Sequence, residues 1–221
     1  YTASEIESDV SSPQNMVDRV EKAVRPVCEE GKLLGLLGGE HTITIGAVKA
    51  LRKYYPDVSV LYLDAHADLR DEYMGSQWSH ACVARRLSEF VPLALVGVRS
   101  LSFSEAEFIR DKNLPVLFWP SGYNDTNSLV DWSLDKLTDD VYISIDLDVL
   151  DPSLMSAVGT PEPGGMMWEQ ITDFLHGIAT SRRIVGFDLT ELSPDEGPEA
   201  CSFTAAKLAY KLVGYATNKV M

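Results

Sequence analysis

The chain has 221 residues, 45% of them hydrophobic, which suits one α/β domain with a sizeable core. Its 33 acidic and 19 basic residues give a formal net charge of −14, which argues against nucleic acid or an anionic membrane as a partner, because both attract a basic face. The three cysteines (Cys28, Cys82 and Cys201) form no CxxC pair, so we expect neither a disulfide framework nor a zinc knuckle, and a reducing compartment, the cytoplasm.

Apolar runs alternate with helix-like stretches along the chain. Helices are predicted near residues 13–30, 44–55, 79–89, 104–111, 128–136, 168–179 and 203–217, and strands near 33–38, 58–64, 92–98, 115–119, 141–147 and 184–189. Most strand-like runs are continuous, which fits strands buried on both faces of a parallel sheet. The pattern predicts right-handed βαβ crossovers and a three-layer α/β/α sandwich with a mainly parallel sheet. We see no linker or repeat, so residues 1–221 are expected to form one domain, and the longest apolar run, 91–98, is too short to cross a membrane.

Acidic residues and histidine are concentrated directly after two of the predicted strands. Asp64, His66 and Asp68 follow the run 58–63, and Asp146 and Asp148 follow the run 141–145. Buried carboxylates this close together repel one another unless a cation neutralises them. The sequence therefore predicts a metal centre with more than one ion.

Further polar residues follow other predicted strands. His41 comes after the run 33–37, and Glu191 comes after the run 184–189. Because the carboxyl ends of parallel strands form one edge of the sheet, where ligands bind, these residues are expected to join the same site. His176 lies in a helix-like stretch without acidic neighbours and is interpreted as structural. The turn-rich loop 159–165 is either a wall of the pocket or an ordinary surface loop.

A mixed carboxylate and imidazole site suits manganese and tolerates cobalt, nickel or zinc. Two ions about 3.5–4 Å apart can share carboxylates and activate one water at neutral pH. Such a nucleophile is able to attack the carbon of a guanidinium group.

Five segments resemble the signature motifs of the ureohydrolases, the family that includes arginase and agmatinase. They occur in the family's order and, with the segment around Glu191, cover most of the chain from about Leu33 to Val213: Gly38-Gly-Glu-His41, Asp64-Ala-His-Ala-Asp68, Ser79-His80, Ser144-Ile-Asp-Leu-Asp-Val-Leu-Asp-Pro152 and Gly159-Thr-Pro-Glu-Pro-Gly-Gly165. The stretch from Asp64 to Tyr73 looks most like agmatinase.

The resemblance implies specific roles. Two manganese ions are bound by six residues: His41, Asp64, His66, Asp68, Asp146 and Asp148. Asp64 and Asp146 bridge both ions, His41 and Asp68 complete one site, and His66 and Asp148 complete the other. His80 matches the family's proton-transfer histidine, and Glu191 matches the glutamate that pairs with the substrate guanidinium.

Two departures from the family pattern stand out. Little before Leu33 resembles the family's N-terminal segment, which leaves open that the chain is a fragment and that the sheet lacks an N-terminal strand. Residues 156–159 replace a stretch that is rich in proline and glycine in the family, which affects the expected shape of the pocket rather than the ligands.

The resemblance predicts a binuclear manganese hydrolase that cleaves agmatine to urea and putrescine, in polyamine biosynthesis, as a homo-oligomer. Asp71 and Glu72 favour a substrate with a cationic tail. The alternatives are a ureohydrolase for arginine, guanidinobutyrate or a formimino compound such as formiminoglutamate, a single-zinc deacetylase, and a non-catalytic metal-binding scaffold of the same fold. The six ligands argue against the deacetylase, and the presence of His80 and Glu191 argues against the scaffold.

Overall fold

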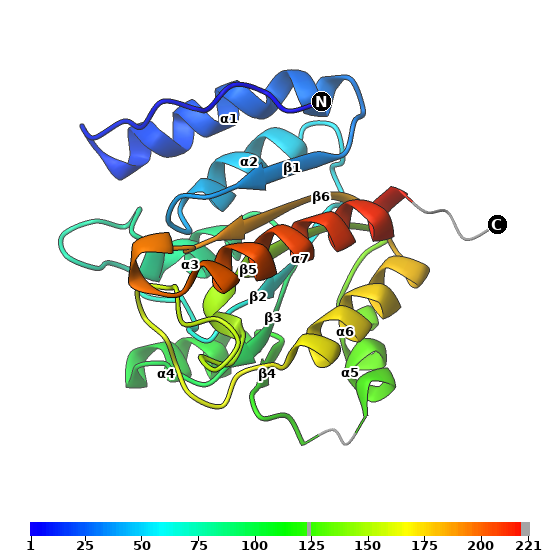
Figure 1. Ribbon diagram of the computed structural model, residues 1–221. Coiled ribbons are helices and arrows are strands. Elements are labelled where there is room, and N and C mark those ends of the chain that lie inside the picture. Colours follow the sequence, from blue (N-terminus) through cyan, green and yellow to red (C-terminus); the bar gives the residue numbers. More distant parts are fainter. Residues whose placement is uncertain (123–124, 218–221) are drawn as a thin grey trace.

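One parallel sheet organises the molecule. The computed structural model describes residues 1–122 and 125–217 (Figure 1). The strands run in the spatial order β1-β6-β5-β2-β3-β4, and each neighbouring pair is parallel. Their bounds are β1 (Leu34–Leu37), β2 (Ser59–Leu63), β3 (Leu93–Val98), β4 (Val116–Phe118), β5 (Asp140–Asp146) and β6 (Arg183–Thr190). Each strand lies within or close to a predicted apolar run, so the predicted sheet is confirmed.

Helices cover both faces of this sheet. They are α1 (Pro13–Glu29), α2 (Ile43–Leu51), α3 (Val83–Leu87), α4 (Phe103–Lys112), α5 (Thr126–Leu134), α6 (Trp168–Ser181) and α7 (Glu199–Thr217), with the 3-10 turns η1 (His80–Cys82), η2 (Leu147–Val149) and η3 (Pro194–Glu196). The stretch predicted as one helix over 79–89 is η1 followed by α3. No helix in the described part of the chain is long and apolar enough to cross a bilayer.

Alternate residues of each strand enter two separate cores. In β2, Val60 and Tyr62 face the core shared with α1, α2 and α3, whereas Leu61 and Leu63 face the core shared with α5, α6 and α7. All four side chains are fully buried. Figure 1 shows α7 crossing one face of the sheet and α1 lying over α2 on the other side. The three-layer α/β/α architecture is therefore confirmed.

Helix α1 packs on the outer side of α2 (Figure 1). It begins at the N-cap Ser12, whose side chain accepts a hydrogen bond from Asn15 N, followed by Pro13 at the first helical position. A Cβ on Gly46 would lie 2.4 Å from Val17 O, so only glycine permits this close helix crossing. Because α1 covers α2, nearly every residue of α2 is buried.

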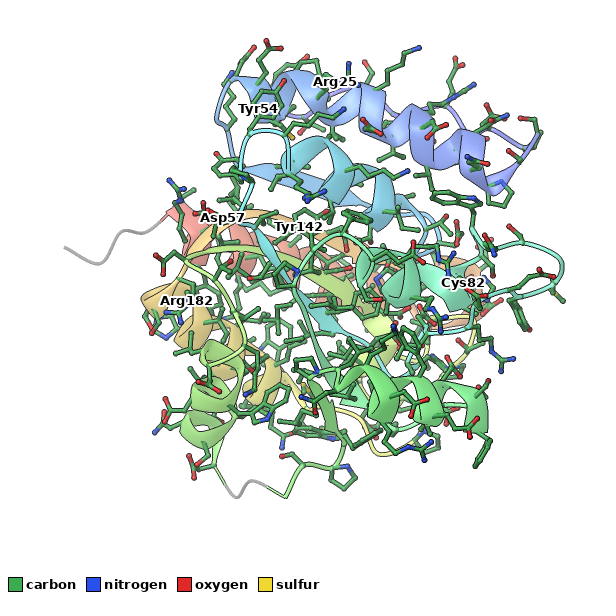
Figure 2. All side chains as sticks on the ribbon, turned by 180° about the vertical axis from the view of Figure 1, so that it is seen from behind. Arg25, Tyr54, Asp57, Cys82, Tyr142 and Arg182 are labelled. Atoms are coloured by element: carbon green, nitrogen blue, oxygen red, sulfur yellow. The ribbon has the colours of Figure 1, made fainter. Side chains whose placement is uncertain are left out.

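The strand order reverses between β2 and β5. The chain moves from β2 outward to β3 and β4, then returns to β5 on the other side of β2 and continues to β6. In open parallel sheets ligands bind at the carboxyl ends of the strands beside such a reversal. Figure 2 shows the two ends of the strands: Asp57 and Arg182, just before β2 and β6, lie on one side of the molecule, and Cys82 of η1 lies on the other. The loops after β2 and β5 thus emerge together on the Cys82 side.

Candidate metal centre

The loops after β1, β2 and β5 bring His41 beside two aspartates. His41 Nδ1 lies 3.2 Å from Asp64 Oδ2 and 3.2 Å from Asp146 Oδ2. Asp68 Oδ2 lies 3.8 Å from the same nitrogen. All four residues are buried. Their potential ligand atoms therefore face one small space that excludes most water.

A second group forms around His66. Its Nδ1 lies 2.8 Å from Asp148 Oδ2 and 3.5 Å from Asp64 Oδ1. Asp64 belongs to both groups, with one oxygen toward each histidine. Asp146 groups with His41, and its Oδ1 accepts a hydrogen bond of 2.8 Å from Asp148 N. The distances thus favour Asp64 as a shared ligand more directly than Asp146.

Backbone N–H groups fix the orientation of these carboxylates. His66 N donates to Asp64 Oδ1 at 2.6 Å, and Ala65 N donates to Asp148 Oδ1 at 3.0 Å. The loop after β2 also lies close to β3. Gly97 of β3 has φ +105°, and a Cβ there would lie 3.0 Å from Asp64 O. Asp68 itself has φ 51°, a left-handed conformation that is uncommon for residues other than glycine. The ligands are therefore held in position by the fold.

The carboxylates repel one another in the absence of a cation. Burial, reinforced by neighbouring carboxylates, raises the pKa of Asp68, Asp146 and Asp148. Burial would also raise the pKa of Asp64, but the imidazoles of His41 and His66 outweigh it and hold the pKa at about 2. Such a site is neutralised either by protons or by bound cations.

Neighbouring carboxylates raise the pKa values of both histidines, against the effect of burial. Burial would lower the pKa of His66, but Asp148 and Asp64 outweigh it and raise the pKa to about 11. Burial opposes protonation of His41 as well, and Asp146 and Asp64 nevertheless raise its pKa well above the usual value. A divalent cation in each group would take the place of these protons.

The buried atoms fit a metal ion. In the described part of the chain, Asp64 Oδ2 is a buried oxygen that accepts no hydrogen bond, an arrangement that costs free energy unless another partner is present. The donors are carboxylate oxygens and imidazole nitrogens, a set suited to manganese and neighbouring divalent ions. The geometry thus offers two adjoining cation sites.

A buried polar network, which the sequence did not reveal, holds His41. Its Nε2 lies 2.8 Å from Ser144 Oγ, and Ser144 donates to Asp188 Oδ1 at 2.8 Å. Asp188 Oδ2 accepts hydrogen bonds from Thr44 Oγ1 at 2.8 Å and Tyr142 OH at 2.7 Å. Since the Ser144 hydroxyl donates to Asp188, its oxygen accepts from His41 Nε2–H. This assigns one ring proton to Nε2, so Nδ1 is the nitrogen that would bind a cation once its own proton is displaced.

Among the other residues considered in the sequence analysis, Glu191 contacts a residue of this centre. Glu191 has φ 65°, and its Oε1 accepts a 2.7 Å hydrogen bond from His41 N. His80 is exposed at the start of η1, with its ring centroid 5.6 Å from that of Tyr73. His176 lies on α6, against the ring of Tyr215, as expected for a structural residue.

Asp71, one of the two acidic residues that were expected to attract a cationic tail, is paired with arginine side chains. Asp71 Oδ1 lies 2.6 Å from Arg86 Nη2 and 3.7 Å from Arg85 Nη2. The sequence argument from Asp71 to a cationic substrate is therefore weakened, because two guanidinium groups already compensate this charge.

The chain is similar to known proteins over most of its length. A family model described as the arginase family matches residues 1–214. The chain is 39% identical over 203 residues to the N(1)-aminopropylagmatine ureohydrolase of Synechocystis sp., covering 90% of this chain and 66% of the relative. It is 37% identical over 212 residues to the agmatinase of Pyrococcus horikoshii, covering 93% and 72%. The chain thus spans just under two thirds of the Synechocystis relative.

A solved structure is similar to this chain over most of its length as well. The agmatine ureohydrolase of Thermoplasma volcanium superimposes with a TM-score of 0.85 at 34% sequence identity, covering 95% of this chain and 71% of that chain.

Proposed function

The chain belongs to the arginase family, and from this premise we propose that the protein is a ureohydrolase that uses two Mn²⁺ ions to hydrolyse a guanidino compound. The observation that carries the proposal is the convergence of two histidines and four aspartates at the strand reversal, in two groups that share Asp64. Cations held there would supply hydroxide at neutral pH by lowering the pKa of water.

Each residue has a defined task in this proposal. His41, Asp68 and Asp146 would hold one cation, and His66 and Asp148 the other. Asp64 would contribute one oxygen to each. A role for Asp146 as a second bridge rests on the family resemblance.

Glu191 and His80 would act on the substrate. Glu191 carries a carboxylate fixed by His41 N, and a planar guanidinium offers parallel donors to such a group. Pairing would orient the guanidinium carbon toward the nucleophile. His80, exposed beside Tyr73, would transfer a proton to the leaving amine.

Agmatine is the proposed substrate, with urea and putrescine as products. A second candidate is N(1)-aminopropylagmatine, because several relatives carry that name, including those of Synechocystis sp. and Thermus thermophilus. Both compounds pair a guanidinium head with a cationic tail. We further propose that residues 1–221 belong to one domain and that the protein acts in the cytoplasm as a homo-oligomer.

A urea-release assay tests the proposal. Protein loaded with Mn²⁺ would be incubated with agmatine, N(1)-aminopropylagmatine, arginine, guanidinobutyrate and formiminoglutamate; the last is scored by release of its own product, formamide. We expect the highest kcat/KM for one of the first two. A preference for arginine would refute the substrate proposal, and no hydrolysis of any of the five would refute the enzymatic one.

A further inference from the structure

The two proposed metal-binding histidines differ in what supports the ring nitrogen that faces away from the centre. For His41 that nitrogen lies in the buried network of Ser144 and Asp188. The His66 side chain is 26% exposed, and its Nε2 lies 3.7 Å from Glu162 Oε1. When Nδ1 binds a cation, Nε2 carries the ring proton and requires an acceptor. Glu162 lies where that acceptor is needed.

Arg99 connects the segments that carry these residues. Its Nη2 donates to Glu162 O at 2.8 Å and to Asp148 O at 2.7 Å. Its backbone N donates to Ala65 O at 2.8 Å, next to His66. One residue therefore sets the relative positions of the two ligand loops and of the loop 159–165.

The loop that carries Glu162 is anchored at its far end as well. Asp151 Oδ2 accepts hydrogen bonds from Gly164 N at 2.9 Å and from Gly165 N at 3.1 Å. A Cβ on Gly165 would lie 2.4 Å from the carbonyl carbon of Leu150, so only glycine allows this approach. Hydrogen bonds thus hold the backbone at Glu162 itself and at Gly164 and Gly165.

We propose that Glu162 orients His66 in the metal centre and that Arg99 holds Glu162 in position. This inference rests on the proposed binuclear site. A carboxylate that accepts a hydrogen bond from the outer nitrogen of a ligating histidine fixes its tautomer and increases its basicity. The 3.7 Å separation is an ion-pair distance, longer than a hydrogen bond, and the proposal requires the two side chains to approach each other when His66 binds a cation. Glu162 is a positioning residue in this account.

Metal titration of the metal-free protein tests the inference without relying on catalysis. Calorimetric titration with Mn²⁺ should show two binding events for the wild type. Glu162→Ala should weaken one of them about 10–100-fold and leave the other unchanged. Glu162→Gln, which keeps an acceptor oxygen, should have a smaller effect. The matched control is Glu169→Ala, an exposed glutamate on α6.

Arg99→Lys provides a second variant. Lysine keeps the positive charge but cannot span the same set of carbonyl oxygens, so the same binding event should weaken. A thermal melt of each variant would verify that it is folded before titration.

The outcomes separate the two proposals. Unchanged Mn²⁺ binding by Glu162→Ala, with or without a raised KM, would overturn the positioning role, and a raised KM alone would indicate contact with substrate. A wild type that binds two ions but hydrolyses no guanidino compound would overturn the proposed function and leave the role of Glu162 intact.

Discussion

Replacing Asp188 with asparagine should disrupt the metal centre from a distance, through the tautomer of His41. The Asp188 carboxylate is fully buried and accepts three hydrogen bonds, from Thr44, Tyr142 and Ser144. An amide can present only one acceptor atom, so at least one of the three hydroxyls loses its acceptor. Hydrogen bonds to a charged group contribute about 1.5–3 kcal/mol each, so we expect unfolding free energy to fall by about 2 kcal/mol.

Metal affinity should fall as well. If the new NH₂ group faces Ser144, the hydroxyl turns to donate to His41 Nε2, and the ring proton moves to Nδ1, where the cation would bind. Loss of such outer support typically lowers metal affinity 10–100-fold. Urea denaturation and Mn²⁺ titration measure the two effects, with Asp173→Asn on the exposed side of α6 as the matched control. Wild-type affinity in both Asp188→Asn and Ser144→Ala would refute the tautomer argument.

Three other predictions concern the centre itself. Asp64→Asn should abolish binding of both ions, because Asp64 belongs to both ligand groups, and metal analysis finding one retained ion would contradict its shared role. His80→Ala should lower kcat about 10²–10⁴-fold with normal metal content, whereas loss of metal would identify His80 as a ligand. The metal-free protein should lose stability as pH rises from about 4 to 8. The reason is that Asp68, Asp146 and His66 have raised pKa values in the folded state, so the unfolded chain releases their protons first. Melting temperatures measured with EDTA and with Mn²⁺ check this: the increase caused by Mn²⁺ should be larger at pH 8 than at pH 5, and an equal increase would contradict the pKa argument.

Local sequence patterns were sufficient to predict the strands and the residues at their ends. Continuous apolar runs identified the six strands of the described residues; Asp64 directly follows β2, and Asp146 is the last residue of β5. The parallel arrangement then placed these side chains at one edge. The prediction that Asp71 attracts a cationic tail was weaker, because Arg85 and Arg86 compensate its charge. Both arginines belong to α3, and their proximity to Asp71 depends on how that helix packs.

The supporting residues could not be predicted, because they depend on strand order and register. In the sheet, Tyr62 of β2 is paired with Ser144 of β5, and Ser144 is paired with Asp188 of β6. This row of polar side chains crosses three neighbouring strands directly beneath His41, with Tyr62 OH 3.0 Å from His41 Nδ1 and 2.7 Å from Asp68 Oδ2.

Each member of this row lies in an otherwise apolar run. A one-residue shift in register would turn the side chains of a strand to the opposite face and break the row. Buried hydroxyl and carboxyl groups are costly without partners, so the row also favours the correct register during folding. The same hydrogen bonds therefore serve two purposes: they select the pairing of β2, β5 and β6, and they prepare His41 to bind a cation.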